Sequence, residues 1–159
     1  MLKQLAIIFL TTSIFSACQN KSENLTNNTE TMEKLAKQEI ENLLMTYKET
    51  LNTSNAEKAT ALYTKDGIFM PSGAPSAIGK EQIKDAYKFV FSQIQLNIEF
   101  FIEEITIENA LAYGVTSSKG STLIHANGQT IPEENRELFV FEKENGTWKI
   151  ARYMFNKTK

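Results

Sequence analysis

The stretch NRELFVFEKENGTWKIARYMFN, residues 135–156, decides the fold. Its centre, Asn145-Gly146, is typical of a two-residue hairpin turn, because a type I′ turn needs positive φ at both central positions. On either side of the turn apolar residues alternate with polar ones, which is the period of a strand with one buried face. The stretch therefore predicts a long antiparallel hairpin.

The length of this turn decides which side chains share a face of the sheet. A two-residue turn places Phe141 opposite Ile150, Phe139 opposite Arg152, and Glu137 opposite Met154. One face then carries Glu137, Phe139, Phe141, Trp148, Ile150, Arg152 and Met154. A three-residue turn would bring Arg136 to that face instead.

Three more features extend the sheet toward the N-terminus. Residues 96–107 alternate, but the phase slips at Glu103-Glu104, which indicates a β-bulge, and bulges bend sheets. Residues 111–115 resume the alternation, and Asn127-Gly128 predicts a second two-residue turn. Together these features predict a curved, four-stranded antiparallel meander.

Helices precede this meander. Residues 32–52 carry one apolar stripe at helical spacing, and Ser54-Asn55-Ala56-Glu57 is a capping-box pattern that starts a shorter helix. A short strand, 67–70, leads into a loop rich in proline and glycine, and a third helix follows Gly79. The order predicts an α+β fold: three N-terminal helices with a cone-shaped, curved antiparallel sheet. The apolar mouth of the cone is a candidate pocket.

The N-terminus, MLKQLAIIFLTTSIFSAC, has the features of a secretory signal: a basic Lys3, an apolar run, and small residues before Cys18. Residues 15–18 resemble the lipobox of bacterial lipoproteins, with Phe15 where leucine is usual, and this resemblance implies a lipidated Cys18. An ordinary signal peptide, or a buried core cysteine, is the alternative. Gln19 is not the aspartate that retains lipoproteins at the inner membrane, which favours the outer membrane.

These patterns divide the chain into a signal peptide, 1–17, a flexible tether with the lipidated cysteine, 18–31, and a folded domain, 32–159. The tether is predicted because its residues are polar and offer little apolar surface to bury. The formal net charge of −2 leaves no basic surplus for nucleic acid. One histidine and one cysteine cannot build a Cys/His zinc site, so we expect neither metal nor cofactor.

Residues 47–87, YKETLNTSNAEKATALYTKDGIFMPSGAPSAIGKEQIKDAY, resemble the opening half of SnoaL-like proteins of the nuclear transport factor 2-like superfamily. Residues 135–156 resemble the closing hairpin of its SgcJ/EcaC-type branch. The resemblance covers roughly 33–157 and implies the fold. It does not select a function, because the superfamily includes isomerases, cyclases, hydrolases, binding domains and oligomerisation domains.

Steroid isomerases of this superfamily use a carboxylate base on the first strand and a tyrosine on the first helix. Tyr47 matches the tyrosine, but the base position falls near Met70 or Pro71, which cannot accept a proton. Asp66 lies nearby and is expected to bond local backbone amides in a turn. The sequence therefore disfavours an isomerase of that mechanism.

The remaining candidates line the predicted pocket: Tyr47, Phe69, Met70, Phe139, Trp148, Arg152 and Met154 as ligand contacts, with Tyr47, Glu137 and Arg152 as catalytic candidates. A buried Glu137–Arg152 pair would be a polar clamp for a ligand or an acid–base pair. The alternative is an ion pair at the sheet edge or in a dimer contact.

We therefore expect a lipid-anchored envelope protein that binds a small, mostly apolar molecule. An enzyme and a protein-interaction module are the alternatives. A homodimer is expected, because the resemblance implies sheets that pair.

Overall fold

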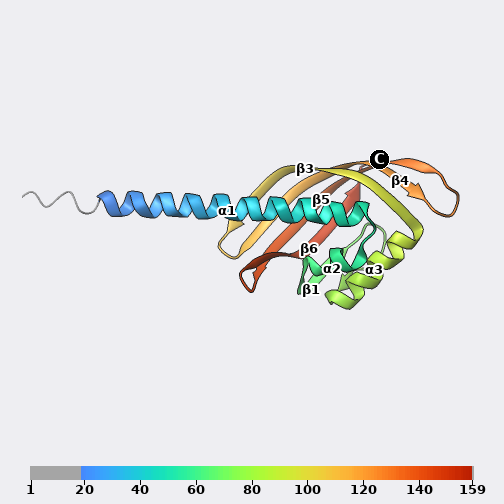
Figure 1. Ribbon diagram of the computed structural model, residues 1–159, viewed down its shortest axis with the longest axis horizontal. Helices are drawn as coiled ribbons and strands as arrows, with labels where there is room; N and C mark the ends of the chain where they lie inside the picture. Colours follow the sequence, from blue (N-terminus) through green and yellow to red (C-terminus); the bar gives the residue numbers. More distant parts are fainter. Residues whose placement is uncertain (1–18, 159) are drawn as a thin grey trace, which may run out of the picture. The chain divides into compact units, whose positions relative to one another are not determined.

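The computed structural model describes residues 19–158. Its elements are α1 (Gln19–Asn52), α2 (Ala56–Ala61), β1 (Tyr63–Met70), β2 (Ala77–Ile78), α3 (Gly79–Gln93), β3 (Ile94–Glu108), β4 (Leu111–Ile124), β5 (Thr130–Glu144) and β6 (Thr147–Lys157), shown in Figure 1. This order is the predicted one, helices first and then the meander. The predicted signal peptide and Cys18 lie outside the described residues.

The chain divides into two compact units, and the boundary falls between Lys34 and Leu35, within α1. The described part of the first unit is helical from Gln19, whereas the sequence predicts a tether up to residue 31. Residues 19–31 contain no glycine or proline, so no residue there interrupts the helical backbone. No helix within residues 19–158 is long and apolar enough to cross a membrane.

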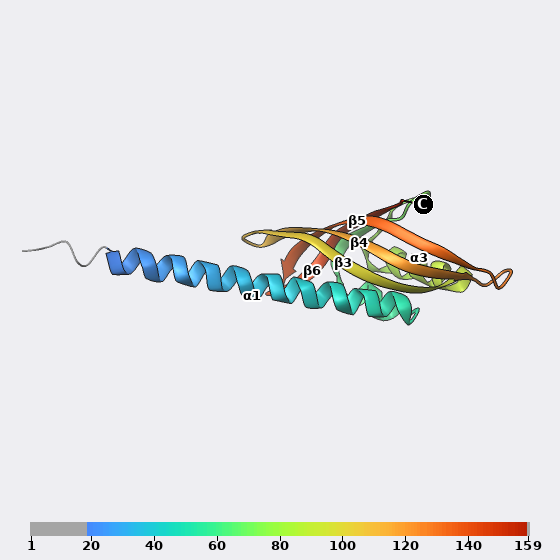
Figure 2. The same ribbon diagram turned by 90° about the horizontal axis from the view of Figure 1, so that it is seen from above.

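The second unit is built on a six-stranded sheet with the order β2-β1-β6-β5-β4-β3. All neighbouring strands are antiparallel except β1 and β6, which run parallel. The sheet curves, and residues 35–52 of α1 lie along one side of it (Figure 2). Two details differ from prediction: β1 begins at Tyr63 rather than Gly67, and the predicted loop contains the short edge strand β2.

The structure confirms the predicted bulge and one of the two predicted two-residue turns. The pairing of β3 with β4 shifts between Ile102 and Glu104, which confirms the bulge. Asn145-Gly146 forms the predicted two-residue turn, with φ of 52° and 78°. Asn127-Gly128 does not form a two-residue turn. The Ile124 N–H donates to the carbonyl of Gln129 and so closes a four-residue loop, 125–128. The His125 N–H also donates to Gln93 at the end of α3, which ties the loop to that helix.

A second bulge, in β6, changes the predicted faces of the C-terminal hairpin. Phe141 pairs with Ile150 as predicted, but Ala151 is skipped, and Phe139 pairs with Tyr153 and Glu137 with Phe155. The predicted pairing of Phe139 with Arg152 and of Glu137 with Met154 is therefore wrong. The bulge turns two aromatic rings inward and keeps a guanidinium out of the apolar interior, where an unpaired charge would be costly.

Aromatic side chains make up a large part of the interior of the second unit. Six rings stack in succession, with centroids 4.3 to 5.7 Å apart: Phe91, Tyr87, Phe69, Tyr153, Phe139 and Phe141. They come from α3, β1, β6 and β5, so the ladder joins a helix to three neighbouring strands. The predicted cone is therefore packed with side chains along this line.

At Gly120, which pairs with Ile98, the backbone of β3 leaves no room for a side chain. A Cβ there would lie 2.1 Å from the Asn97 carbonyl oxygen and 2.8 Å from the Ile98 Cα. We expect Gly120→Ala to lower the free energy of unfolding by about 3 kcal/mol, because the obstructing atoms are backbone. In urea unfolding, the control Gly128→Ala should lose about 1 kcal/mol, from its left-handed φ alone. Equal losses would contradict the clash.

Candidate functional site

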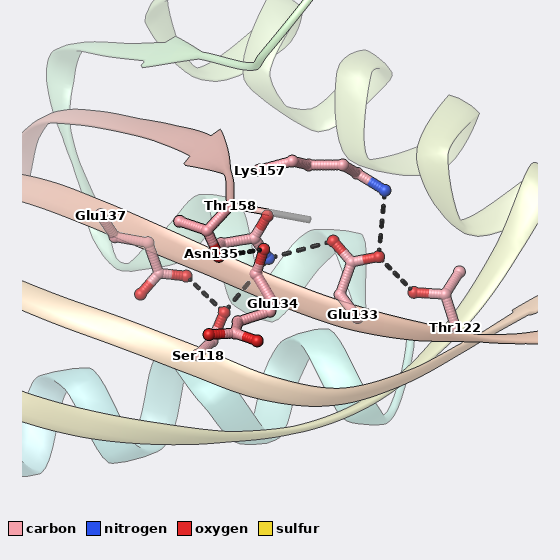
Figure 3. A network of polar contacts seen from close by, with 8 residues as sticks. All are labelled: Ser118, Thr122, Glu133, Glu134, Asn135, Glu137, Lys157 and Thr158. Atoms are coloured by element: carbon pink, nitrogen blue, oxygen red, sulfur yellow. Dashed lines mark hydrogen bonds and ion pairs between the residues drawn. The ribbon is translucent and has the colours of Figure 1, made fainter.

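A row of polar side chains lies on the inner face of β5, in an interior that is otherwise mostly apolar and rich in aromatic rings. Glu133, Asn135 and Glu137 are 7%, 6% and 4% exposed, and they share a face because alternate residues of a strand point the same way. We call these three residues the polar row. Their hydrogen-bond partners on the neighbouring β4 are Thr116, Ser118 and Thr122. Figure 3 shows most of this network.

Within residues 19–158, the groups that donate hydrogen bonds to Glu137 are all neutral. Ser118 Oγ donates to its Oε1 over 2.9 Å, the Thr116 hydroxyl donates to Oε2, and the Tyr153 hydroxyl lies 3.5 Å from Oε1. None of the ion pairs within residues 19–158 includes Glu137. Burial raises the pKa of its carboxyl, and the three hydrogen bonds oppose that rise in part.

This raised pKa predicts a pH dependence of stability. The contribution of Glu137 is fully present below the ordinary glutamate pKa of about 4.3 and is lost as pH rises through the higher pKa of the folded state. We expect Glu137→Gln to remove that decline, so the variant gains stability relative to the native protein between acidic and neutral pH. Urea unfolding from pH 4 to 7.5 measures it, with Glu134→Gln as control. Identical pH slopes for the native protein and Glu137→Gln would contradict the prediction.

Asn135 and Glu133 continue the row toward the surface. Asn135 Nδ2 donates to Glu133 Oε1 at 3.0 Å and to Ser118 Oγ at 3.2 Å. Glu133 Oε2 accepts from Thr122 at 2.8 Å and from the Lys157 ammonium at 3.1 Å. The Lys157 side chain is 52% exposed, so the row reaches solvent at this end. Asn135 Oδ1 is buried and accepts no hydrogen bond from the described chain.

A cluster of buried tyrosines adjoins the row. The hydroxyls of Tyr47 and Tyr87 share a hydrogen bond, and those of Tyr63 and Tyr87 share another of 2.7 Å. Burial raises the pKa of all three hydroxyls well above the ordinary value, so these tyrosines stay neutral. The ring of Tyr47 lies 5.3 Å from that of Tyr153, which touches Glu137. The predicted role of Tyr47 as an oxyanion donor stays a prediction.

The structure divides the predicted ligand contacts between two faces. Phe69, Phe139 and Trp148 are buried inside, as the prediction placed them. Met70 and Arg152 are on the outer side of the sheet, as is Met154, which is 40% exposed and pairs with Met70. Arg152 is therefore not brought to Glu137, and its guanidinium donates to the carbonyl of Ala151.

The buried residues of β1 are Tyr63, Thr64, Gly67 and Phe69, none of which has a carboxyl group, and Asp66 is exposed. Glu133, Asn135 and the hydroxyls of β4 were not predicted as site residues. The strand alternation could have predicted two of them, because Glu133 and Asn135 are in phase with the apolar positions Phe139 and Phe141 and so point to the same face. No three His, Cys, Asp or Glu side chains in the described part of the chain gather to hold a metal ion.

A separate groove of about 340 Å³ lies away from the polar row. Its lining residues are Glu39, Asn42, Leu43, Thr46, Leu62, Gly146, Thr147, Trp148 and Lys149, from α1, the end of α2 and the last hairpin. Trp148 contributes a buried indole whose N–H has no acceptor within the described residues. The Lys143 ammonium lies 5.1 Å from the centre of that ring.

Over residues 40–155 the chain matches the family described as the SnoaL-like domain. It is similar to a ketosteroid isomerase-like protein from Erwinia carotovora atroseptica, with 29% identity and a TM-score of 0.73 over 76% of this chain and 94% of that one. It is also similar to a nuclear transport factor 2-like superfamily protein from Salmonella enterica, with 18% identity and a TM-score of 0.72 over 80% and 94%. No curated protein matches the chain by sequence. These likenesses confirm the predicted α+β fold, and the SgcJ/EcaC-type branch stays a prediction.

Proposed function

Because this chain belongs to the SnoaL-like domain family, we propose that it binds a small, mostly apolar molecule inside its curved sheet, at the polar row. The observation that carries this proposal is Asn135 Oδ1, a buried acceptor without a partner in the described chain. Leaving such a group unpaired costs about 1–3 kcal/mol, which a hydrogen bond from a ligand would recover. The surrounding rings supply the apolar contacts, among them Phe69, Phe139 and Tyr47.

The ligand would enter at the end of the row that reaches the surface. There the Lys157 side chain covers Glu133 and is half exposed. Phe155, which pairs with Glu137, is only half-buried, so its ring can turn aside at less cost than the fully buried Phe139. Entry at this end leaves most of the aromatic ladder in place.

Native mass spectrometry of the protein extracted from its own cells tests the proposal. We expect a bound small molecule on the native protein and none on Asn135→Leu. Asn156→Leu is the matched control, because it makes the same change at an exposed position of β6, and it should keep the ligand. A native protein that is empty in repeated preparations would contradict the proposal.

The outer face of the sheet supports the proposed homodimer. Leu138 and Met154 pair across β5 and β6 and are each 40% exposed, and Tyr113 and Phe101 are exposed on the same side. Contiguous exposed apolar surface of this kind marks protein contacts. Arg152 lies on this face, which fits its alternative interpretation as a dimer-contact residue. The same mass spectra give the subunit number, and a monomer at micromolar concentration would contradict the dimer.

An enzyme is the second candidate, favoured by Glu137. Its carboxyl has a raised pKa and lies beside the Tyr153 hydroxyl, so it could act as a base in place of the missing carboxylate on β1. Among the predicted isomerase, cyclase and hydrolase activities, the likeness to a ketosteroid isomerase-like protein supports the isomerase. A bound molecule that the native protein returns chemically altered, and Glu137→Gln returns unchanged, would establish this candidate.

Lipid anchoring in the bacterial envelope, at the outer membrane, completes the proposal. It rests on the lipobox-like residues 15–18, because acyl chains on Cys18 would give stable membrane binding. We expect Cys18→Ser to move the protein from the membrane fraction to the supernatant after cell lysis. A variant that still sediments with membranes would contradict the lipoprotein assignment.

A further inference from the structure

The polar row has more negative than positive charge around it. Glu133 and Glu137 are both buried, and the nearest ammonium, that of Lys157, is paired with Glu133 at 3.1 Å. The guanidinium of Arg152, which the sequence places beside Glu137, lies on the other side of the sheet because of the bulge at Ala151. A ligand carboxylate would therefore meet two carboxylates here and one lysine that is already paired.

Within the described residues, the polar row contains a buried hydrogen-bond acceptor to which no group donates. Asn135 directs its NH₂ group to the Glu133 carboxylate, which can only accept, so its Oδ1 is the atom left without a partner. Glu137 accepts from hydroxyl groups and from no cation within the described residues. An ammonium group has several donors and a charge, which would suit both positions.

Aromatic faces border the same place. Phe155 pairs with Glu137 across the sheet, and its ring stacks on those of Tyr153 and Phe69, with centroids 5.8 and 6.3 Å away. Aromatic rings attract cations through their electron-rich faces, most strongly when water is excluded. A metal ion gains less here, because the row holds only two carboxylates and the rings offer no lone pairs.

We infer that the molecule bound at the polar row is an organic cation, a small amine or ammonium compound whose charged head lies between Glu137, Asn135 and Phe155. This inference rests on the binding function proposed above and names its ligand class. The apolar part of the ligand would lie along the aromatic ladder, and the positive charge would balance Glu137. The Lys157 ammonium would compete only weakly with the ligand for Glu137, because it is paired with Glu133 at the entrance.

Three probes of similar shape and different charge test the inference on the purified native protein: benzylamine, benzyl alcohol and benzoate. Isothermal titration calorimetry at neutral pH gives their Kd values. We expect the Kd of benzylamine to be lower than that of benzyl alcohol by a factor of about ten or more. A buried ion pair and a cation–aromatic contact account for a difference of this size. Benzoate should bind least.

Variants locate the effect. Glu137→Gln should weaken benzylamine by about ten-fold and leave benzyl alcohol almost unchanged, since it removes charge and keeps shape. Lys157→Met should strengthen benzylamine, because it removes a competing cation at an exposed position. The control Glu134→Gln removes the same charge from the outer side of β5 and should change neither Kd.

The outcomes separate the two proposals. If benzyl alcohol binds at the row, with loss in Asn135→Leu, and benzylamine binds no better, the organic-cation inference is overturned and the binding function stands. If none of the three probes binds and the protein from its own cells is empty, the binding function is overturned with it. A charge preference that persists in Glu137→Gln would also overturn the inference.

Discussion

Phe139→Ala is expected to lower the free energy of unfolding by about 4 kcal/mol, the typical cost of removing a fully buried phenylalanine. The ring is 0% exposed, stacks on Tyr153 at 4.3 Å and on Phe141 at 5.7 Å, and meets the ring of Tyr47 edge to face. Its removal breaks the aromatic ladder between Tyr153 of β6 and Phe141 of β5. Because the ladder joins α3 to three strands, the neighbours cannot close the space without moving the sheet.

Urea unfolding followed by tryptophan fluorescence measures this loss. Phe89→Ala is the matched control, because Phe89 is 67% exposed on α3 and alanine suits a helix, so its stability should change by less than about 0.5 kcal/mol. A small loss for Phe139→Ala would mean that the ladder does not hold the sheet together.

Tyr87→Phe is the second change with a large expected effect. The Tyr87 hydroxyl bonds to those of Tyr47 and Tyr63, and all three are buried, so its removal leaves two hydroxyls each without one bond. An unsatisfied buried group costs about 1–3 kcal/mol, and we expect a total loss of about 3 kcal/mol. Ring packing stays the same, so the effect isolates the hydrogen bonds.

The triple variant with phenylalanine at 47, 63 and 87 sharpens this test. Replacing all partners by apolar groups of the same shape can be nearly neutral, so the triple variant should be more stable than Tyr87→Phe. Thermal unfolding of the native protein and both variants would show the order. If the triple variant loses the sum of three single losses, the hydroxyls contribute independently and the cluster is not cooperative.

The polar row shows why the proposed binding site depends on one strand. The two carboxylates and the amide of β5 share a face with Phe139 and Phe141, and the hydroxyls of β4 hold them there. Glu137 lies on the predicted face, but its predicted neighbour Arg152 does not. Without Arg152 beside it, Glu137 has no cationic partner within the described residues, and this is the basis for inferring an organic cation as the ligand.

The chain's local signals determined most of the fold. The Asn145-Gly146 turn, the alternation of the four long strands and the bulge near Glu103-Glu104 were all readable, because turn geometry and strand period act over a few neighbouring residues. The conformation of the loop at Asn127-Gly128 was not predictable from local sequence, because a hydrogen bond to the end of α3, which is distant in sequence, holds the loop.

Only the tertiary structure decided which side of the sheet Arg152 takes. Residues 150–155 carry apolar side chains in both phases of the strand, so the local pattern permits a straight strand or a bulge. The rings of Phe69 and Phe139, from other strands, stack on Tyr153 and stabilise it inside, whereas Arg152 would have been buried there as a charge. The strand period comes from the sequence, and the choice between its two phases comes from the packing of the whole interior.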